Sequence, residues 1–183
     1  MSLLQFILPY SYIQYLHLLI FSTQFGSMIW MSFIQGILLF KRLPKQQFSL
    51  IQSIVFPVYF IFCSLGITCM LTIQYNTTQY NKQSLYIYNL VGMLFMCLCN
   101  QLFIGPKTTE IMWRNHQIQR DNNKLTNTNN ASSTLQQQPT LNKQFAIYHG
   151  ISSLLNLLVV IGLVLHGVYL TNTLGNMNKR LVL

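Results

Sequence analysis

The sequence has 183 residues, of which 51% are apolar and only 7% are charged, with a formal net charge of +9. A soluble domain usually carries about 25% charged residues, so this composition excludes an ordinary water-soluble surface. The cations stand in short segments between apolar runs, which favours an integral membrane protein over a nucleic-acid-binding one. We therefore expect membrane lipids, and no nucleic acid, as partners.

Four apolar segments follow one another along the chain, each long enough to cross the roughly 30 Å of hydrocarbon in a bilayer. Backbone polar groups in lipid must be satisfied within the protein, so these segments should be helices. The sequence predicts an all-α, polytopic membrane protein, an antiparallel bundle of four transmembrane helices. Residues 1–183 then form a single membrane domain, with spans at about 12–40, 50–73, 85–104 and 145–170.

The connection between the third and fourth spans differs from the other two in length and composition. The segment from about residue 115 to 144 is rich in Asn and Gln and has no apolar periodicity. Such segments bury too little apolar surface to offset the loss of chain entropy on folding. Taken alone, this segment is predicted to be a disordered polar loop.

Lysine and arginine are distributed unequally between the two sides of the predicted bundle, and Pro44 ends the first helix beside one group of them. The positive-inside rule places the first and third loops in the cytosol or the mitochondrial matrix, with both termini opposite. The first and third loops hold Lys41, Arg42, Lys45, Lys107, Arg114, Arg120, Lys124 and Lys143, whereas the other side holds Lys82, Lys179 and Arg180.

The first residues show neither a positive n-region nor an arginine-rich amphipathic pattern, so we expect no removable targeting segment. This permits an organelle membrane, and the mitochondrial inner membrane is the location we favour.

Small residues recur four positions apart in the first span, a spacing that lets helix backbones approach closely in lipid. Helix packing is predicted for Ser22, Gly26, Ser32 and Gly36, with a cavity beside Gly26 as the alternative. Polar side chains inside the spans usually bond across helices, and a polar transport path is the alternative. These side chains are His17, Gln24, Ser27, Gln35, Asn100, Gln101, Asn156 and His166.

Cofactor and metal chemistry has little support in the sequence. His17 and His166 are expected at the same level of the membrane, so a bis-histidine haem is an alternative to interfacial or interhelical histidines. Soft sulfur ligands for Cu(I) are the alternative to ordinary apolar filling at Cys69, Met70, Met93, Met96, Cys97 and Cys99. We expect no cofactor and no metal.

Catalytic signatures are also missing: the spans contain no paired carboxylates, and the chain has no GxSxG, HExxH or phosphate-binding loop. Glu110 is expected to pair with Arg114 four residues later on a helix. We therefore expect the protein not to be an enzyme.

Three stretches together resemble the transmembrane protein 205-like family, also described as a domain of unknown function. They are "HLLIFSTQFGSMIWMSFIQGILLFKRLPKQQFSLIQSIVFPVYF" (17–60), "GPKTTEIMWRNHQIQRD" (105–121) and "FAIYHGISSLLNLL" (145–158). The resemblance implies four membrane spans and lends no settled enzyme activity. Positions that fit its motifs include His17, Gly26, Trp30, Gly36, Pro44, Gln52, Tyr59, Pro106, Trp113, His149, Gly150, Ser152 and Asn156.

By topology, the "RLP", "GPKTT" and "YHG" motifs gather at the inner face of the membrane. One polar, cationic cluster is predicted there, able to hold an anionic lipid head group: Lys41, Arg42, Asn100, Lys107, Thr108, Thr109 and His149. The other interpretation, which we favour, is that these residues only close the two inner helix turns. The function expected overall is a non-catalytic scaffold or accessory subunit among other membrane-protein subunits, in a mitochondrial respiratory assembly if the location is right. The alternative function is a small-molecule or metal-ion transporter.

Overall fold

The described residues of the computed structural model, 10–77, 84–125 and 132–181, form helices and no strands. The helical elements are α2 (Tyr10–Ile29), η1 (Trp30–Gln35), α3 (Gly36–Arg42), α4 (Lys45–Thr77), α5 (Ser84–Cys99), η2 (Asn100–Ile104), α6 (Gly105–Leu125) and α7 (Ser132–Leu181). The predicted all-α class is confirmed for this part of the chain.

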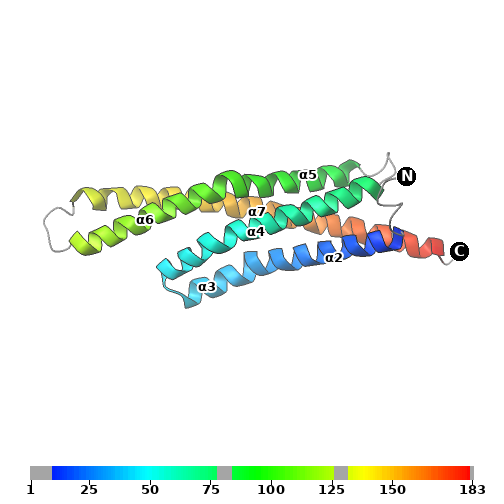
Figure 1. Cartoon of the computed structure of the whole chain (residues 1–183), viewed down its shortest axis with the longest axis horizontal. Helices are drawn as coiled ribbons and strands as arrows, with labels where there is room; N and C mark the ends of the chain where they lie inside the picture. The colour runs from blue at the N-terminus through cyan, green and yellow to red at the C-terminus, as the bar shows by residue number, and fades with distance from the viewer. Residues whose placement is uncertain (1–9, 78–83, 126–131, 182–183) are drawn as a thin grey trace.

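Four helical stretches are long and apolar enough to cross a membrane: Ser11–Arg42, Gln46–Thr77, Leu85–Asp121 and Pro139–Gly175. They run antiparallel, as Figure 1 shows. The α3–α4 turn and the facing ends of α6 and α7 lie at one end, here called the cationic end. The start of α2 and the end of α7 lie at the other, here called the terminal end. The predicted four-helix membrane bundle is therefore confirmed.

The first two spans are separated by a sharp turn at Leu43 and Pro44. Helix α3 ends at Arg42, and Leu43 adopts an extended conformation with φ −112° and ψ 147°. An extended backbone is favoured before proline because the ring clashes with a helical predecessor. Helix α4 then begins at Lys45, so Pro44 ends the first helix as predicted.

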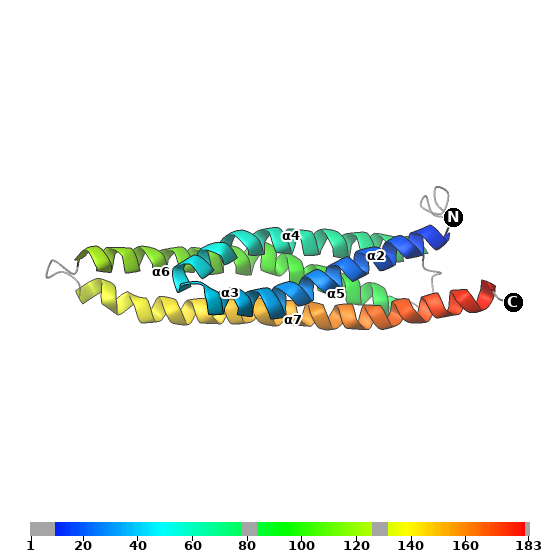
Figure 2. The same cartoon turned by 90° about the horizontal axis from the view of Figure 1, so that it is seen from below.

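The expectation of a disordered loop over about 115–144 is wrong for most of this segment. Helix α6 continues to Leu125 and α7 begins at Ser132, and the two form a paired hairpin beyond the α3–α4 turn (Figure 2). Both helices extend from apolar spans, so their growth requires no new nucleation. The Asn115 side chain also donates a hydrogen bond of 2.8 Å to the side-chain oxygen of Asn142 across the hairpin.

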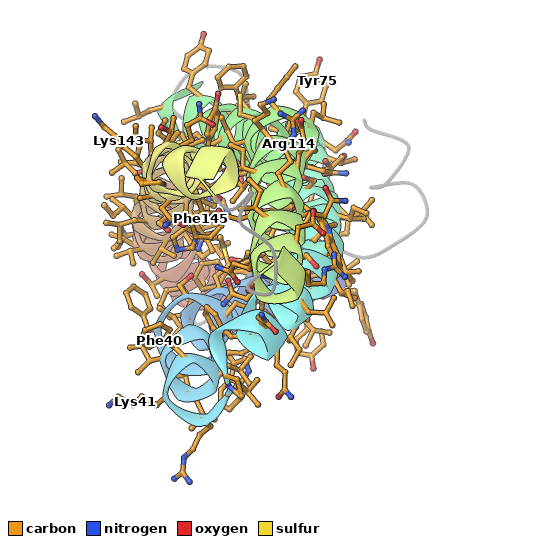
Figure 3. All side chains as sticks on the ribbon, turned by 90° about the vertical axis from the view of Figure 1, so that its left-hand side faces the viewer. Phe40, Lys41, Tyr75, Arg114, Lys143 and Phe145 are labelled. Atoms are coloured by element: carbon orange, nitrogen blue, oxygen red, sulfur yellow. The ribbon has the colours of Figure 1, made fainter. Side chains whose placement is uncertain are left out.

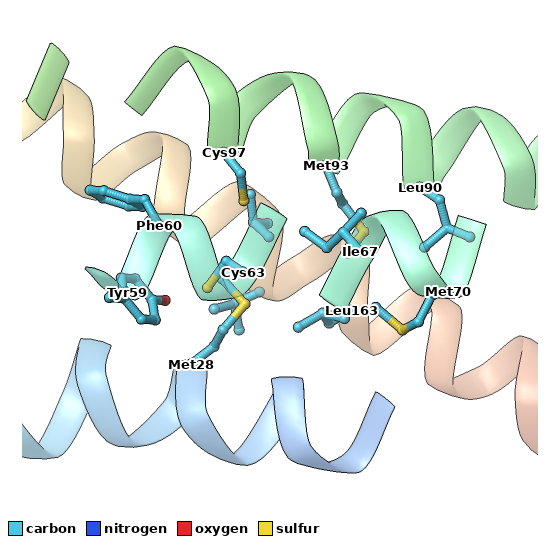
Figure 4. Close-up of a cluster of buried hydrophobic side chains, with 12 residues drawn as sticks. Met28, Tyr59, Phe60, Cys63, Ile67, Met70, Leu90, Met93, Cys97 and Leu163 are labelled. Atoms are coloured by element: carbon cyan, nitrogen blue, oxygen red, sulfur yellow. The ribbon is translucent and has the colours of Figure 1, made fainter. Parts of the chain in front are cut away.

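The core lies among α2, α4, α5 and α7, and it includes several sulfur-bearing side chains (Figure 4). Met28, Cys63, Ile67, Met70 and Met93 have almost no exposed surface. In lipid, van der Waals packing stabilises such a core because burial from water no longer drives helices together. The remaining buried members of the cluster are Tyr59, Phe60, Leu90, Cys97, Val159, Val160 and Leu163.

Candidate functional site

Side chains from the first three spans form hydrogen bonds to two successive turns of α7, in the half of the bundle nearer the cationic end. Asn156 donates a hydrogen bond of 2.6 Å to the Ser32 hydroxyl and accepts one of 2.9 Å from the Tyr59 hydroxyl. One turn earlier on α7, the carbonyl of Ser152 accepts a bond of 3.2 Å from the Asn100 side chain. We call these five residues the polar node.

Two of the helices reach the polar node through π-helical turns, which are rare and occur frequently at functional sites. Ser32 lies in η1 and Asn100 in η2, so each π turn supplies one polar contact to α7. Each π turn is also followed directly by a glycine, Gly36 or Gly105. The Gly105 N–H donates to the Asn100 carbonyl, and a Cβ at Gly105 would lie only 2.7 Å from that oxygen.

His17 and His166 form a second buried contact, nearer the terminal end. Their Nε2 atoms lie 3.0 Å apart, and the two side chains are 1% and 0% exposed. One imidazole must donate and the other accept, so this is an interhelical hydrogen bond. A metal–imidazole bond is about 2 Å long, so two opposed axial ligands would stand about 4 Å apart. The bis-histidine haem considered from the sequence does not fit this spacing.

Further hydrogen bonds join the spans along the bundle. The Gln74 amide donates to the Tyr169 hydroxyl over 2.8 Å, the Asn89 amide to the Gly162 carbonyl over 2.9 Å, and the Gln24 amide to the Phe62 carbonyl over 3.1 Å. Of the polar side chains singled out in the sequence, His17, Gln24, Asn100, Asn156 and His166 all bond across helices. This is the arrangement of interhelical contacts, the first of the two interpretations given above.

The glycines that the helices pack against are different from those the sequence indicated. A Cβ at Gly66 would overlap the Gln24 side chain, and one at Gly162 would lie 2.7 Å from Met93 Sδ. A Cβ at Gly167 would lie 2.8 Å from the ring of Phe21. Sequence reasoning missed these three positions because their close contacts depend on partners from other helices.

The four small residues of the first span that were predicted to pack against other helices are Ser22, Gly26, Ser32 and Gly36, and most of them make no close contact with another helix. Gly26 and Ser22 are exposed, and a Cβ at Gly26 would meet no atom within 4 Å. Gly36 has ordinary space around it, with the nearest atom 3.9 Å away. Of these four small residues, Ser32 alone has a hydrogen bond to another helix among the described residues, the bond that it accepts from Asn156.

An apolar groove of about 690 Å³ lies where Gly26 faces α4. The first span contributes Gly26, Trp30 and Met31 to its lining, and α4 contributes Val58, Tyr59 and Phe62, among others. Trp30 is 51% and Val58 65% exposed, so the groove opens away from the core toward the surrounding lipid. Gly26 therefore borders an open groove rather than an enclosed cavity.

The residues of the predicted head-group cluster occupy separate places. Lys41 and Arg42 are exposed at the end of α3, and Lys41 and Arg114 lie on different sides of the cationic end (Figure 3). Lys107 pairs with Glu110 on α6, Asn100 is 1% exposed within the bundle, and the Thr108 hydroxyl donates to the Ile104 carbonyl. Thr109 is half-buried on α6, and His149 stacks on Phe145 of its own helix. Within the described part of the chain, no hydrogen bond, ion pair or ring contact joins α3 to these α6 and α7 residues.

The ion pair expected on α6 is present, and a second cation joins it. Arg114 lies 2.6 Å from Glu110, as the four-residue spacing indicated, and Lys107 lies 2.9 Å from the other carboxylate oxygen. All three side chains are substantially exposed, so screening by water and salt keeps their contribution to stability small.

Comparison with known proteins assigns this chain to a family. The family model described as "Domain of unknown function (DUF4149)" matches residues 19–117, more than half of the chain. The chain belongs to the DUF4149 family. Its match runs from α2 through α6 and includes both π turns and the groove, whereas Ser152 and Asn156 on α7 lie beyond it.

A curated relative extends the similarity over nearly the whole chain. The DUF4149 chain is 29% identical to Transmembrane protein 205 of Danio rerio over 91% of its own length and 96% of that protein. This agrees with the family resemblance carried by residues 17–60, 105–121 and 145–158. No solved structure matches the chain to a significant degree.

Proposed function

We propose that this chain is a non-catalytic membrane scaffold that acts as an accessory subunit of a larger membrane assembly. The observation that carries the proposal is that the polar side chains inside the bundle bond to other spans. Asn156, Asn100 and His166 bond to other spans, so they lock the helices together. A preassembled bundle of this kind presents fixed surfaces to neighbouring subunits.

The α6–α7 hairpin supplies a surface for such a neighbour outside the hydrocarbon. It extends past the α3–α4 turn and is held by the Asn115–Asn142 bond (Figure 2). The Ser49 hydroxyl on α4 also lies 3.1 Å from His116 Nε2, which ties α6 to the rest of the bundle. Arg120 and Lys143 are exposed on the hairpin, so an acidic surface on a partner subunit would complement it.

The location we propose is the mitochondrial inner membrane, with the cationic end in the matrix. The unequal distribution of lysine and arginine supports this orientation through the positive-inside rule. Fractionation of native membranes, followed by protease treatment of the sealed inner membrane from each side, would test both statements. Cleavage of the hairpin from the intermembrane side would contradict the orientation.

Purification of the full chain from native membranes in a mild detergent tests the accessory role. We expect one or more partner subunits to co-migrate with it in native electrophoresis. The double variant Arg120→Gln/Lys143→Gln should lose the partner, whereas the charge-preserving Arg120→Lys/Lys143→Arg should keep it. A solitary monomer in the unmodified protein would contradict the proposal.

Transport of a small molecule or metal ion is the second candidate, and one observation favours it. Within the described residues, Gln24 Oε1, Asn100 Oδ1 and His166 Nδ1 are buried without a hydrogen-bond partner. Buried polar groups usually have a protein or water partner, so these atoms are places where a polar solute would bond. Solute uptake by proteoliposomes that Gln24→Leu or Asn100→Leu abolishes would favour transport over the scaffold role.

A further inference from the structure

Next to the groove between the first span and α4, toward the cationic end, lies a separate small hollow of about 10 Å³ with a more polar lining. Beside Gly26, Trp30 and Phe62 the lining of the groove is apolar. The hollow shares Met31 and Val55 with the groove and adds the amide side chains of Gln35 and Gln52. Beyond these amides, α3 ends at the exposed cations Lys41 and Arg42.

This order from apolar wall to amide to cation matches the order of groups in a phospholipid. An acyl chain needs only apolar contact, the glycerol ester carbonyls accept hydrogen bonds, and a phosphate accepts charge-assisted bonds from Lys and Arg. An apolar helix from a partner would also fit the groove. It would have no hydrogen-bond acceptor for the amides, however, and no anion for the cations.

The depth of the groove also fits a lipid of the leaflet at the cationic end. Gly26 stands nine positions before Gln35, which is about 13 Å along a helix at about 1.5 Å per residue. Half of a hydrocarbon core about 30 Å thick is about 15 Å. A lipid whose ester groups lie at Gln35 would therefore have the distal part of an acyl chain at the level of Gly26.

The cations at the end of α3 stand apart from the carboxylates that the structure describes. Glu110 and Asp121 are the two acidic residues of the whole chain, and Glu110 is engaged by Lys107 and Arg114. Within the described residues, no carboxylate forms an ion pair with Lys41 or Arg42. Long basic side chains at a helix end reach the membrane interface, where anionic head groups are available.

We propose that the groove between α2–η1 and α4 binds one acyl chain of an anionic phospholipid whose phosphate is bound by Lys41 and Arg42. Gln35 and Gln52 then face the ester region, and the open space beside Gly26 receives the distal part of the chain. The inference requires that the first two spans lie in the membrane, and it does not depend on the scaffold role. Its failure would leave the scaffold proposal standing.

Trp30 lines the groove and provides a probe, because the chain has only one other tryptophan, Trp113. The full chain carrying Trp113→Phe would be reconstituted in phosphatidylcholine vesicles. Small amounts of phosphatidylglycerol or phosphatidylcholine, each brominated near the end of an acyl chain, would then be added. We expect the brominated anionic lipid to quench Trp30 fluorescence at least twofold more than brominated phosphatidylcholine at the same mole fraction.

Two pairs of variants separate the head-group and acyl-chain contributions. Lys41→Gln/Arg42→Gln should bring the quenching ratio of the two lipids to about one, whereas Arg120→Gln/Lys143→Gln, with the same loss of charge, should keep it. Gly26→Leu should reduce quenching by both lipids at least twofold, because its side chain fills the groove. Gly92→Leu is the matched control, since a Cβ there also meets no atom within 4 Å but lies on α5.

Protease mapping of each vesicle preparation would establish that the charge variants keep the same orientation. Equal quenching by the two lipids in the unmodified groove would overturn the proposal, as would a preference that survives Lys41→Gln/Arg42→Gln. Weak quenching by both lipids, together with energy transfer between labelled copies, would show a second copy in the groove and would also overturn it.

Discussion

Asn156 on α7 donates a hydrogen bond of 2.6 Å to Ser32, and this bond fixes the π-helical turn of the first span against the fourth. The same side chain accepts the bond from the Tyr59 hydroxyl, which is buried with its residue 5% exposed. A single amide therefore holds three spans together, and removing it has consequences on each of them.

The substitution Asn156→Ala should lower the free energy of unfolding by about 1–2 kcal/mol, because it removes both bonds and leaves the Tyr59 hydroxyl without its acceptor. Unfolding by a denaturing detergent in mixed micelles would measure the change. Ser153→Ala, at an exposed neighbouring position on α7, should stay within about 0.5 kcal/mol of the unmodified protein. Equal losses for the two variants would contradict a specific role for the polar node.

A double-mutant cycle on His17 and His166 should give a coupling free energy of about 0.5–1.7 kcal/mol, the range found for hydrogen bonds between membrane helices. The direct contact of 3.0 Å between the Nε2 atoms is the physical reason. Repeating the cycle with His17 and His149 provides the control, since His149 stacks on Phe145 of its own helix. Purely additive losses for His17→Ala and His166→Ala would argue against the bond.

Gly66→Ala should destabilise the bundle by about 1–3 kcal/mol, because the added methyl group would overlap the side chain of Gln24. The double variant Gln24→Ala/Gly66→Ala should be more stable than Gly66→Ala alone, since the shorter side chain leaves room. Thermal unfolding in detergent would rank the three proteins. The prediction fails if the second substitution adds a further loss.

Gly105→Ala should disturb the π turn η2, since its Cβ would stand 2.7 Å from the Asn100 carbonyl oxygen. The expected readout is slower disulfide formation between Asn115→Cys and Asn142→Cys in a cysteine-free background, because α6 must move relative to α7. Gly92→Ala should leave the rate unchanged, as its Cβ meets nothing within 4 Å. An unchanged rate in both variants would show that η2 absorbs the methyl group.

The spans and the interior location of the polar residues are predictable from the sequence, but the pairing of those residues is not. Apolar runs and the Pro44 turn depend on local chemistry, so they could be identified directly. Asn156 and His166 could be assigned to the bundle interior because lipid penalises isolated polar groups. Their partners Tyr59 and His17 stand about one hundred or more positions earlier in the chain, and one sequence does not specify such contacts.

The π turns and the hairpin show why the remaining features could not be predicted. A π turn adds a residue to one helical turn, and only the glycines Gly36 and Gly105 that follow the two turns hint at it. The sequence of the hairpin gives only weak signals for helices. The hairpin is helical because α6 and α7 extend the membrane spans, and the Asn115–Asn142 bond joins the two helices. Gly26 and Gly66 likewise differ only in what the neighbouring helix places opposite them.

Helix α7 has 50 residues, which at about 1.5 Å each is about 75 Å, more than twice the thickness of the hydrocarbon. Helices α5, η2 and α6 likewise follow one another without a break. The hairpin is thus built from the same continuous helices that cross the membrane. The residues that hold the hairpin together and the core residues Met93 and Leu163 therefore belong to uninterrupted helices, with no loop between them.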